Sequence, residues 1–390
     1  MKQKWEYSYD AQGRLDSVTD WNDTLSTVST SRKFQYGYLT NTAAIETITA
    51  SFSGTTTTSI EKRNRNMAGR LDSITTVNAQ GAVLSRHAYQ MDNAGRRTSA
   101  TLKDGSTWRY GYNSKGEVTS AKKHLPAGTV LAGHQFEYDF DGIGNRTKAR
   151  YNGDSNGDLL REIVYTANSN NQYSAISHPG EIGVVGITPA ASVIVNGNAA
   201  TRQGDYFFGE ASEASHVNGD WKQITIDDGA NSVSGHQWMA PESFAPVYDA
   251  DGNLLQDGRW DYTWNAENRL IKMETAASAR NVGAPWIIVE SLYDSYGRRI
   301  QRIQTDKDPA GVVLSSQTHH YRYDGWNCIA RTTADWSNAL YYTWGTDLSG
   351  SLQGAGGVGG LLGVKQQNGT TSHRSNPCYD GNGNVTAYID

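Results

Sequence analysis

The sequence predicts an all-β protein, built as an array of β-hairpins with a small β-sandwich-like module inserted in it. Two observations predict this class. A short turn motif recurs along the chain, and aromatic residues alternate with polar residues just before several of its copies. Abundant Thr, Ser, Tyr and Val among the 390 residues favour strands, and helix signals are nearly absent.

The recurring motif is an aromatic residue, Asp or Asn, two free positions, Gly or Asn, a polar residue and usually an apolar one. It is matched fully by YDAQGRL at 9–15 and by YDADGNL at 248–254. Nine further copies with substitutions begin at residues 65, 91, 112, 140, 167, 264, 293, 323 and 379. Most copies are separated by one hairpin's length of chain, so we expect one hairpin per unit.

The residue types of the motif explain why it closes a hairpin. Asp or Asn at the second position accepts hydrogen bonds from main-chain N–H groups two or three residues on. The fifth position favours the left-handed conformation, which Gly adopts most readily and which we also expect for Asn171, Asn268 and Asn327. The predicted turn residues are Asp10, Gly13, Arg14, Asp141, Gly144, Asp249, Gly252, Asp294, Gly297, Asp324, Asp380 and Gly383.

Rows of aromatic residues at every second position precede four copies of the motif, which places each row on one face of a strand. Exposed rows of this kind can stack on sugar rings. The other interpretation is the inter-strand packing that any large sheet needs. The candidates for carbohydrate stacking are Trp108, Tyr110, Trp260, Tyr262 and Trp264.

The motif divides the chain into three regions. Hairpin repeats cover residues 1–178 and 247–390, and the second block ends in a glycine-rich tail segment. Residues 179–246 lack the motif, and their short strand-like stretches between Asn-Gly and Asp-Gly turns predict an inserted β-rich module. Elaborated loops on the main sheet are the alternative for this region.

The repeated YDxxGR/N unit resembles the YD repeats of RHS proteins, the class of bacterial Rhs polymorphic toxins, Tc toxin shell components and animal teneurins. The segments YTWGTDLSGSLQGAGGVGGLLGV (342–364) and PCYDGNGNVTAYID (377–390) are similar to the tail region of bacterial RHS proteins. The resemblance implies a spiralling sheet of hairpins that forms an open part of a shell or cocoon. Because both ends of the chain lie inside the repeat pattern, we expect a fragment or truncated member of a larger RHS protein.

Charge and hydropathy exclude several classes of partner. The formal net charge of −5, with acids and bases interspersed, gives no basic stripe for nucleic acid. The longest apolar runs are far shorter than the roughly 18 residues of a membrane span. The first residues are strand-like and lack a signal-peptide pattern, so we expect either a targeting segment upstream in a longer protein or another export route. Cys328 and Cys378 lack the partners of a disulfide framework or a metal site, so we interpret them as free thiols.

Segments that resemble catalytic or metal-binding motifs lack the required residues at the required positions. The loop that begins at Asp249 lacks the Gly and Glu of a calcium loop, and NGDSNGD (152–158) has Ile163 where that loop needs an acid. Gly354, Gly356 and Gly359 spell GxGxxG without a following helix, which indicates a crossing where main chains pack closely. DPAGVV (308–313) lacks the glycines of the RHS autoprotease segment. We therefore predict no catalytic residue, no metal and no cofactor.

Three functions are compatible with these features. The first is a non-catalytic shell or display module of a secreted or cell-surface RHS protein, whose partner is the rest of that protein or an enclosed C-terminal toxin or effector polypeptide. The second is an extracellular carbohydrate-binding or adhesion module that uses the aromatic rows. The third, with the least support, is a carbohydrate-active enzyme, since distant carboxylates can meet in a fold.

Overall fold

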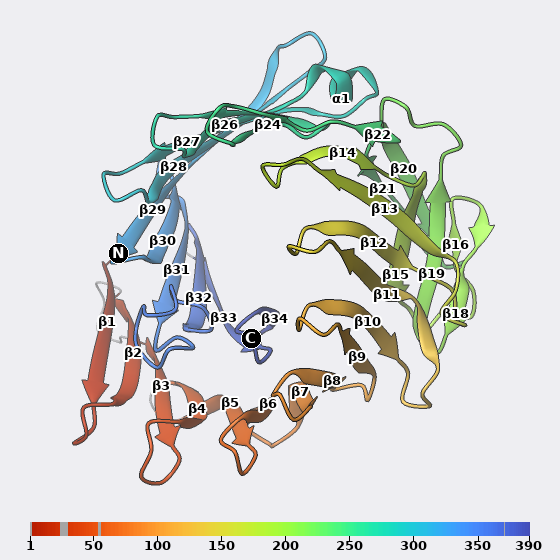
Figure 1. The fold of residues 1–390 in the computed structure, drawn as a ribbon. Coiled ribbons are helices and arrows are strands. Elements are labelled where there is room, and N and C mark those ends of the chain that lie inside the picture. The colour runs from red at the N-terminus through yellow and green to blue at the C-terminus, as the bar shows by residue number, and fades with distance from the viewer. Residues whose placement is uncertain (1, 24–29, 54–55, 370) are drawn as a thin grey trace. The chain divides into compact units, whose positions relative to one another are not determined.

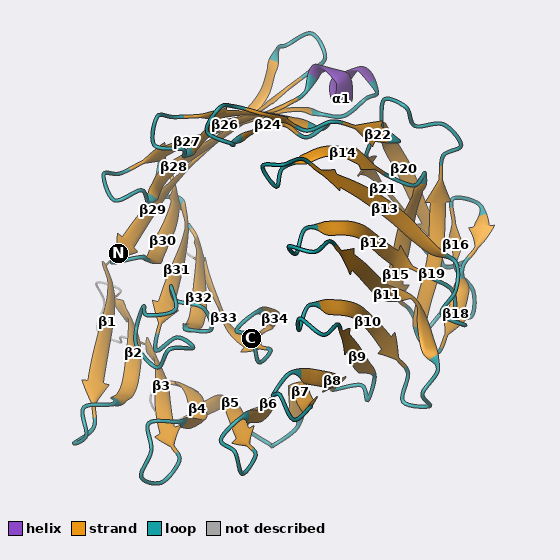
Figure 2. Cartoon of the chain, viewed as in Figure 1, coloured by secondary structure: helices purple, strands orange, loops and turns teal. Residues whose placement is uncertain are grey.

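The computed structural model describes residues 2–23, 30–53, 56–369 and 371–390. These residues form antiparallel β-sheets and one short helix, α1 (Ala277–Asn281) (Figure 2). The predicted all-β class is confirmed. The chain divides into two compact units: unit 1 contains Met1–Gly105, Tyr293–Gln301 and Thr318–Asp390, and unit 2 contains Ser106–Leu292 and Arg302–Gln317.

In unit 1, strands that follow each other in the chain also pair with each other (Figure 1). The N-terminal series is β1 (Lys2–Tyr9), β2 (Leu15–Asp23), β3 (Thr30–Tyr38), β4 (Ile45–Phe52), β5 (Thr56–Arg65), β6 (Leu71–Asn78), β7 (Val83–Met91) and β8 (Arg97–Leu102). The C-terminal series is β30 (Asn327–Thr333), β31 (Asn338–Trp344), β32 (Leu361–Asn368), β33 (Thr371–Tyr379) and β34 (Val385–Ile389).

The two series of unit 1 pack against each other as layers. Their apolar contact brings Leu362 of β32 onto residues of β2, β3 and β4, including Val18 and Phe34, which are 0% and 2% exposed. Polar contacts run between the same layers, because Trp5 Nε1 donates to Thr343 Oγ1 at 3.1 Å and the Thr346 N–H donates to the Tyr36 hydroxyl at 3.3 Å. The core cluster contains Leu15, Val18, Phe34, Tyr36, Ile45, Ile48, Ala50 and Leu362.

Unit 2 has the same meander of neighbouring strands. Its hairpin strands are β9 (Thr107–Tyr112), β10 (Val118–His124), β11 (Val130–Phe140), β12 (Arg146–Asn152), β13 (Leu160–Ala167), β14 (Tyr173–Ser177), β22 (Ser243–Phe244), β23 (Val247–Tyr248), β24 (Leu254–Gln256), β25 (Trp260–Trp264), β26 (Leu270–Thr275) and β27 (Trp286–Tyr293). The last residue of β27, Tyr293, belongs to unit 1, and strands β28 (Arg299–Lys307) and β29 (Val313–Asp324) also contribute residues to both units.

The inserted region of unit 2 forms two small sheets, ordered β15-β19-β18 and β17-β16-β20-β21. Val193 and Val195, 1% and 0% exposed, belong to a core cluster that also contains Val184 and Phe207. The predicted borders after residues 178 and 246 fall between β14 and β15 and between β22 and β23. The strands are β15 (Glu181–Ile187), β16 (Ile194–Val195), β17 (Asn198–Ala199), β18 (Thr201–Gln203), β19 (Tyr206–Ser212), β20 (Asp220–Asp227) and β21 (Ser232–Met239).

Candidate functional site

The turn of the first repeat shows how the motif closes a hairpin. One carboxylate oxygen of Asp10 accepts hydrogen bonds from the N–H groups of Gln12 and Arg14, both at 2.9 Å. The other oxygen accepts from Arg14 Nε at 2.7 Å. Gly13 has φ 76°, and its N–H donates to the Asp10 carbonyl at 3.0 Å. The loop therefore satisfies its acid from within.

The same bonds recur at four of the other five predicted turn acids. The carboxylates of Asp141, Asp249, Asp294 and Asp380 each accept two main-chain N–H groups at 2.8–3.0 Å. Hydrogen bonds, the largest from the Asn253 side chain, hold the pKa of Asp249 below its usual value. The glycines of these turns have positive φ: Gly144, Gly252, Gly297 and Gly383.

A register shift precedes the turns and was not predicted. The first residue of the motif sits where the antiparallel pairing slips by one residue, as in a β-bulge. The bulge lets a loop of this length connect two paired strands. The shift occurs at Tyr9, Arg65, Met91, Tyr112, Phe140, Ala167, Tyr248, Trp264, Tyr323 and Tyr379.

The copy at 323–329 departs from the others. Asn171 and Asn268 have positive φ, at 60° and 57°, but Asn327 does not, so the expectation for Asn327 was wrong. Asp324 pairs with Asn327 across a tighter turn, in which Gly325 takes the positive φ of 54°. Gln353 of the glycine-rich segment supplies hydrogen bonds to this turn instead. Its Nε2 donates to the Asp324 carbonyl at 2.8 Å, and its Oε1 accepts the Trp326 N–H at 2.9 Å.

The aromatic rows are half-buried and use their polar edges inside the protein. The Tyr262 hydroxyl donates to Asp257 and Trp264 Nε1 donates to the Leu254 carbonyl, both at 2.7 Å. Trp108 stacks on Phe136, with ring centroids 6.1 Å apart. Tyr110 and Trp260 are also half-buried, and Arg259 lies over the Trp260 ring at 4.9 Å. Carbohydrate stacking at these residues stays a prediction.

Asp347 organises the glycine-rich segment 345–360. This residue is 2% exposed, and its carboxylate accepts the N–H groups of Ser349, Ala355 and Gly357 at 2.9, 2.6 and 3.1 Å. Burial raises the pKa of Asp347, but these hydrogen bonds and the Ser349 hydroxyl lower it more. A Cβ on Gly359 would lie 3.4 Å from the Gly383 Cα, so the close main-chain packing expected here is present.

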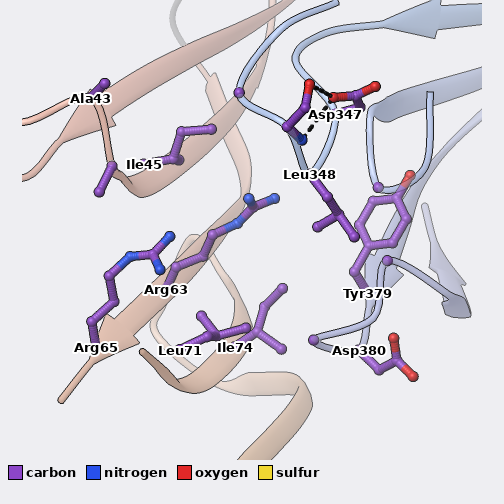
Figure 3. A pocket seen from close by; sticks show the side chains of 16 residues that line it. Ala43, Ile45, Arg63, Arg65, Leu71, Ile74, Asp347, Leu348, Tyr379 and Asp380 are labelled. Atoms are coloured by element: carbon purple, nitrogen blue, oxygen red, sulfur yellow. Dashed lines mark hydrogen bonds between the residues drawn. The ribbon is translucent and has the colours of Figure 1, made fainter. Parts of the chain in front are cut away.

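A cavity of about 370 Å³ opens beside this segment in unit 1 (Figure 3). Its apolar wall comes from Ile45, Leu71, Ile74 and Leu348. Arg63 and Arg65 reach in from β5, on one face of the strand because they are two residues apart.

The charged side chains of the cavity differ in how many of their hydrogen bonds are already made within the protein. The lining carboxylates of Asp347 and Asp380 are occupied by their own loops. Arg63 Nε donates to Glu61 at 2.7 Å. Arg65 Nη1 donates to the Gly69 carbonyl at 3.2 Å, and the buried Arg65 Nε has no hydrogen-bond partner. The cavity therefore presents guanidinium groups beside an apolar wall, an arrangement that suits an anion on an apolar stem.

Sequence reasoning missed this cavity. The stretch EKRNR at 61–65 has the composition of a solvated strand, and the alternation of Arg63 and Arg65 was the available signal.

The described residues were also compared with the requirements of metal sites, disulfides and membrane-spanning helices. No group of three or more His, Cys, Asp or Glu side chains in the described ranges could hold a metal ion. Cys328 and Cys378 are free thiols. The described helix α1 is too short to cross a membrane.

Comparisons with known proteins give partial similarities. No protein-family model matches the chain. The tRNA nuclease WapA of Bacillus subtilis (strain 168) is 29% identical over 129 residues, which are 31% of this chain and 5% of that protein. The tRNA(Glu)-specific nuclease WapA of Bacillus subtilis subsp. natto is 32% identical over 100 residues, 25% of this chain and 4% of that protein. The matched stretch is thus about one twentieth of the relatives' length.

Among solved structures, the crystal structure of TcdB2-TccC3-Cdc42 matches 98% of this chain and 19% of its own chain, with a TM-score of 0.43 and 14% identity. The Photorhabdus luminescens Tc holotoxin pore with the TccC3-D651A mutation matches 99% of this chain and 23% of its own, with a TM-score of 0.31 and 12% identity.

Proposed function

We propose that the chain is a non-catalytic structural section of an RHS-type protein, which encloses or presents a partner polypeptide. The observation that supports this most is repetition, because one turn geometry joins successive antiparallel strands in both units. A unit of this kind buries its surface only against its neighbours, which suits an extended wall. The partial sequence similarity to WapA proteins supports a relation to RHS-type toxins.

The use of the acids supports a structural role. The carboxylates of Asp141 and Asp294, like those of the other regular turns, accept the N–H groups of their own loops. A general acid or base must instead reach a substrate proton. The nuclease activity named for the WapA relatives belongs to those proteins, and we do not assign it to this chain.

The partner in this proposal is the remainder of a larger RHS protein or an effector polypeptide that it encloses. We propose a secreted or cell-surface location for the assembly, in keeping with the expectation from the RHS resemblance.

Protease protection of the protein produced from its natural coding region tests the proposal. We expect mass spectrometry after native digestion to recover intact polypeptide from outside residues 1–390, and this polypeptide to become digestible after denaturation in guanidinium. If every segment outside residues 1–390 is digested equally fast before and after denaturation, nothing is enclosed and the proposal is wrong.

Carbohydrate binding is the alternative, and the half-buried rings around Trp260 motivate it. Glycan-array binding that disappears on Trp260→Ala or Trp108→Ala, with an unchanged unfolding curve, would favour this alternative.

A further inference from the structure

We propose that the arginine-lined cavity of unit 1 binds an acidic side chain of an extended polypeptide. The inference rests on the proposed function, because the polypeptide would be the enclosed or presented partner named there. Its structural basis lies within unit 1 alone, between β5, the glycine-rich segment and the last repeat turn (Figure 3).

The first reason is the unused hydrogen-bonding capacity of Arg65. A guanidinium carries five N–H donors, and buried donors in native proteins nearly always have an acceptor. Arg65 makes one bond, from Nη1 to the Gly69 carbonyl, while its Nε is buried and without a partner. A carboxylate beside Arg65 would supply the acceptor and match the planar fork of the guanidinium.

Arg63 adds a second positive charge directed into the same space (Figure 3). The Arg63 side chain is 11% exposed, and its Nε donates a hydrogen bond to the Glu61 carboxylate. The neighbouring Glu61 outweighs burial and raises the pKa of Arg63, so this guanidinium stays charged. Glu61 therefore offsets the charge of Arg63, and Arg65 is the cation that has no carboxylate partner among the described residues.

The acids that line the cavity take their hydrogen bonds from other donors than the arginines. The Asp347 carboxylate accepts from the loop N–H groups, and the Asp380 carboxylate accepts from the N–H groups of Asn382 and Asn384. Both carboxylates therefore stabilise their own loops rather than the arginines. The N–H donor that an incoming carboxylate can use is the buried Nε of Arg65.

The apolar wall and the volume argue for a side chain rather than a hydrated inorganic ion. Ile45, Leu71 and Ile74 line the cavity and lie near Arg63 and Arg65 (Figure 3). A cavity of about 370 Å³ falls at the small end of ligand pockets, roughly 300–1,000 Å³. Such a space takes the methylene stem of a Glu together with a flanking apolar residue.

Calorimetric titration of the full chain with a matched pair of peptides tests the proposal. The probes are N-acetyl-Leu-Glu-Leu-amide and its glutamine counterpart, N-acetyl-Leu-Gln-Leu-amide. We expect the glutamate peptide to bind about ten-fold more tightly, because a charge-assisted bond replaces a neutral one. Equal affinity for the two peptides, or no binding of either, would overturn the proposal.

Arg65→Gln is the informative variant, because Arg65 holds one hydrogen bond and its replacement leaves the Arg63–Glu61 pair intact. We expect it to abolish the preference for glutamate. The matched control is Arg70→Gln, which removes the same charge from an exposed position on the following turn and should leave the preference unchanged. An equal loss in both variants would show that net charge, and not the cavity, causes the preference.

Two further outcomes separate this inference from the proposed function. Inorganic phosphate that binds in an Arg65-dependent way, when neither peptide binds, would identify a small-anion site and overturn the docking proposal. Protease protection of an enclosed polypeptide with no peptide preference would overturn the docking site while leaving enclosure supported.

Discussion

The inserted module of unit 2 and the layered part of unit 1 both pack one sheet against another, but with different chemistry. The module buries an apolar cluster in which Val193 and Val195 are 1% and 0% exposed. The layers of unit 1 also bury ions, since Asp20, Arg32 and Lys365 are 1%, 4% and 0% exposed. The comparison separates a core that needs only apolar surface from a core whose buried ions also need hydrogen-bond or ion-pair partners.

The ions of unit 1 come from facing layers. Asp20 of β2 is paired in register with Arg32 of β3, and Lys365 of β32 with Arg374 of β33. Arg32 Nη2 donates to the Asp20 carboxylate at 3.1 Å, and Lys365 Nζ donates to Gln3 Oε1 at 3.3 Å. A buried charge costs several kcal/mol unless it is bonded, so we expect this cluster to fix how the layers meet.

Asp20→Ala should have the largest effect. The change leaves the Arg32 guanidinium buried without its carboxylate and also removes the acceptor of the Thr343 hydroxyl. We expect the free energy of unfolding of unit 1, measured by urea denaturation, to fall by about 3–5 kcal/mol.

Two controls define that result. Glu6→Ala removes an exposed ion pair with Lys4 and the hydrogen bond from Trp21 Nε1, and its cost should be much smaller than that of Asp20→Ala. The double variant Asp20→Leu with Arg32→Met should recover most of the loss, because it removes both ions. A loss for Asp20→Ala no larger than for Glu6→Ala would mean that the buried pair is not needed.

Lys365→Met should stabilise the protein at neutral pH. Burial first, and then the neighbouring Arg374, lower the pKa of Lys365 to about 8. In the unfolded chain that pKa is about 10.4, so the charged lysine opposes folding. Two pKa units correspond to about 3 kcal/mol, which is the upper bound of the gain.

The pH dependence gives the sign of this effect. Below about pH 8, Lys365 is charged in both states and its full cost is present. Between about pH 8 and 10.4 the folded protein releases the proton first, so the wild type gains stability relative to Lys365→Met and the difference shrinks. Lys62→Met, at an exposed position of the same unit, is the control for the loss of one lysine charge. Parallel stability curves for wild type and Lys365→Met would contradict the prediction.

Val195→Ala tests the apolar side of the comparison. Val195 is 0% exposed, and removing two methyl groups should lower the stability of the module by about 2 kcal/mol through lost burial and a small cavity. Hydrogen exchange of β16 and β20 amides measures the loss locally. Val233→Ala on the exposed face of β21, 61% exposed, is the matched control and should change little.

The difference between local and long-range contacts also explains what the sequence could predict. The Asp10 turn is made by residues at most four positions apart, so its bonds follow from the motif itself. Gln3 and Lys365 are 362 residues apart, and their contact depends on how two layers meet, which no local pattern encodes. The same limit hid the cavity, where Arg63 and Arg65 face loops from the other end of the chain.

The inserted module falls between these cases. Its turns indicated short strands, but the packing of its two sheets depends on contacts between β16 and β19, which belong to different sheets. The tighter turn at Asp324 was missed for a related reason, because Gln353, which bonds it, lies in another segment.

Gly13→Ala should have the smallest effect, and it tests the local end of the comparison. Gly13 has φ +76°, and a Cβ built there meets no atom within 4 Å, so the cost is backbone strain alone, about 1 kcal/mol. Gly142→Ala is the control, because a Cβ at Gly142 also meets no atom within 4 Å but this glycine has no positive φ. The stability of the Gly142→Ala variant should therefore change little. Urea denaturation of both variants measures the difference. If Gly13→Ala cost as much as Asp20→Ala, the turns would be as decisive for folding as the buried layer contacts, and the contrast between local and long-range determinants would not hold.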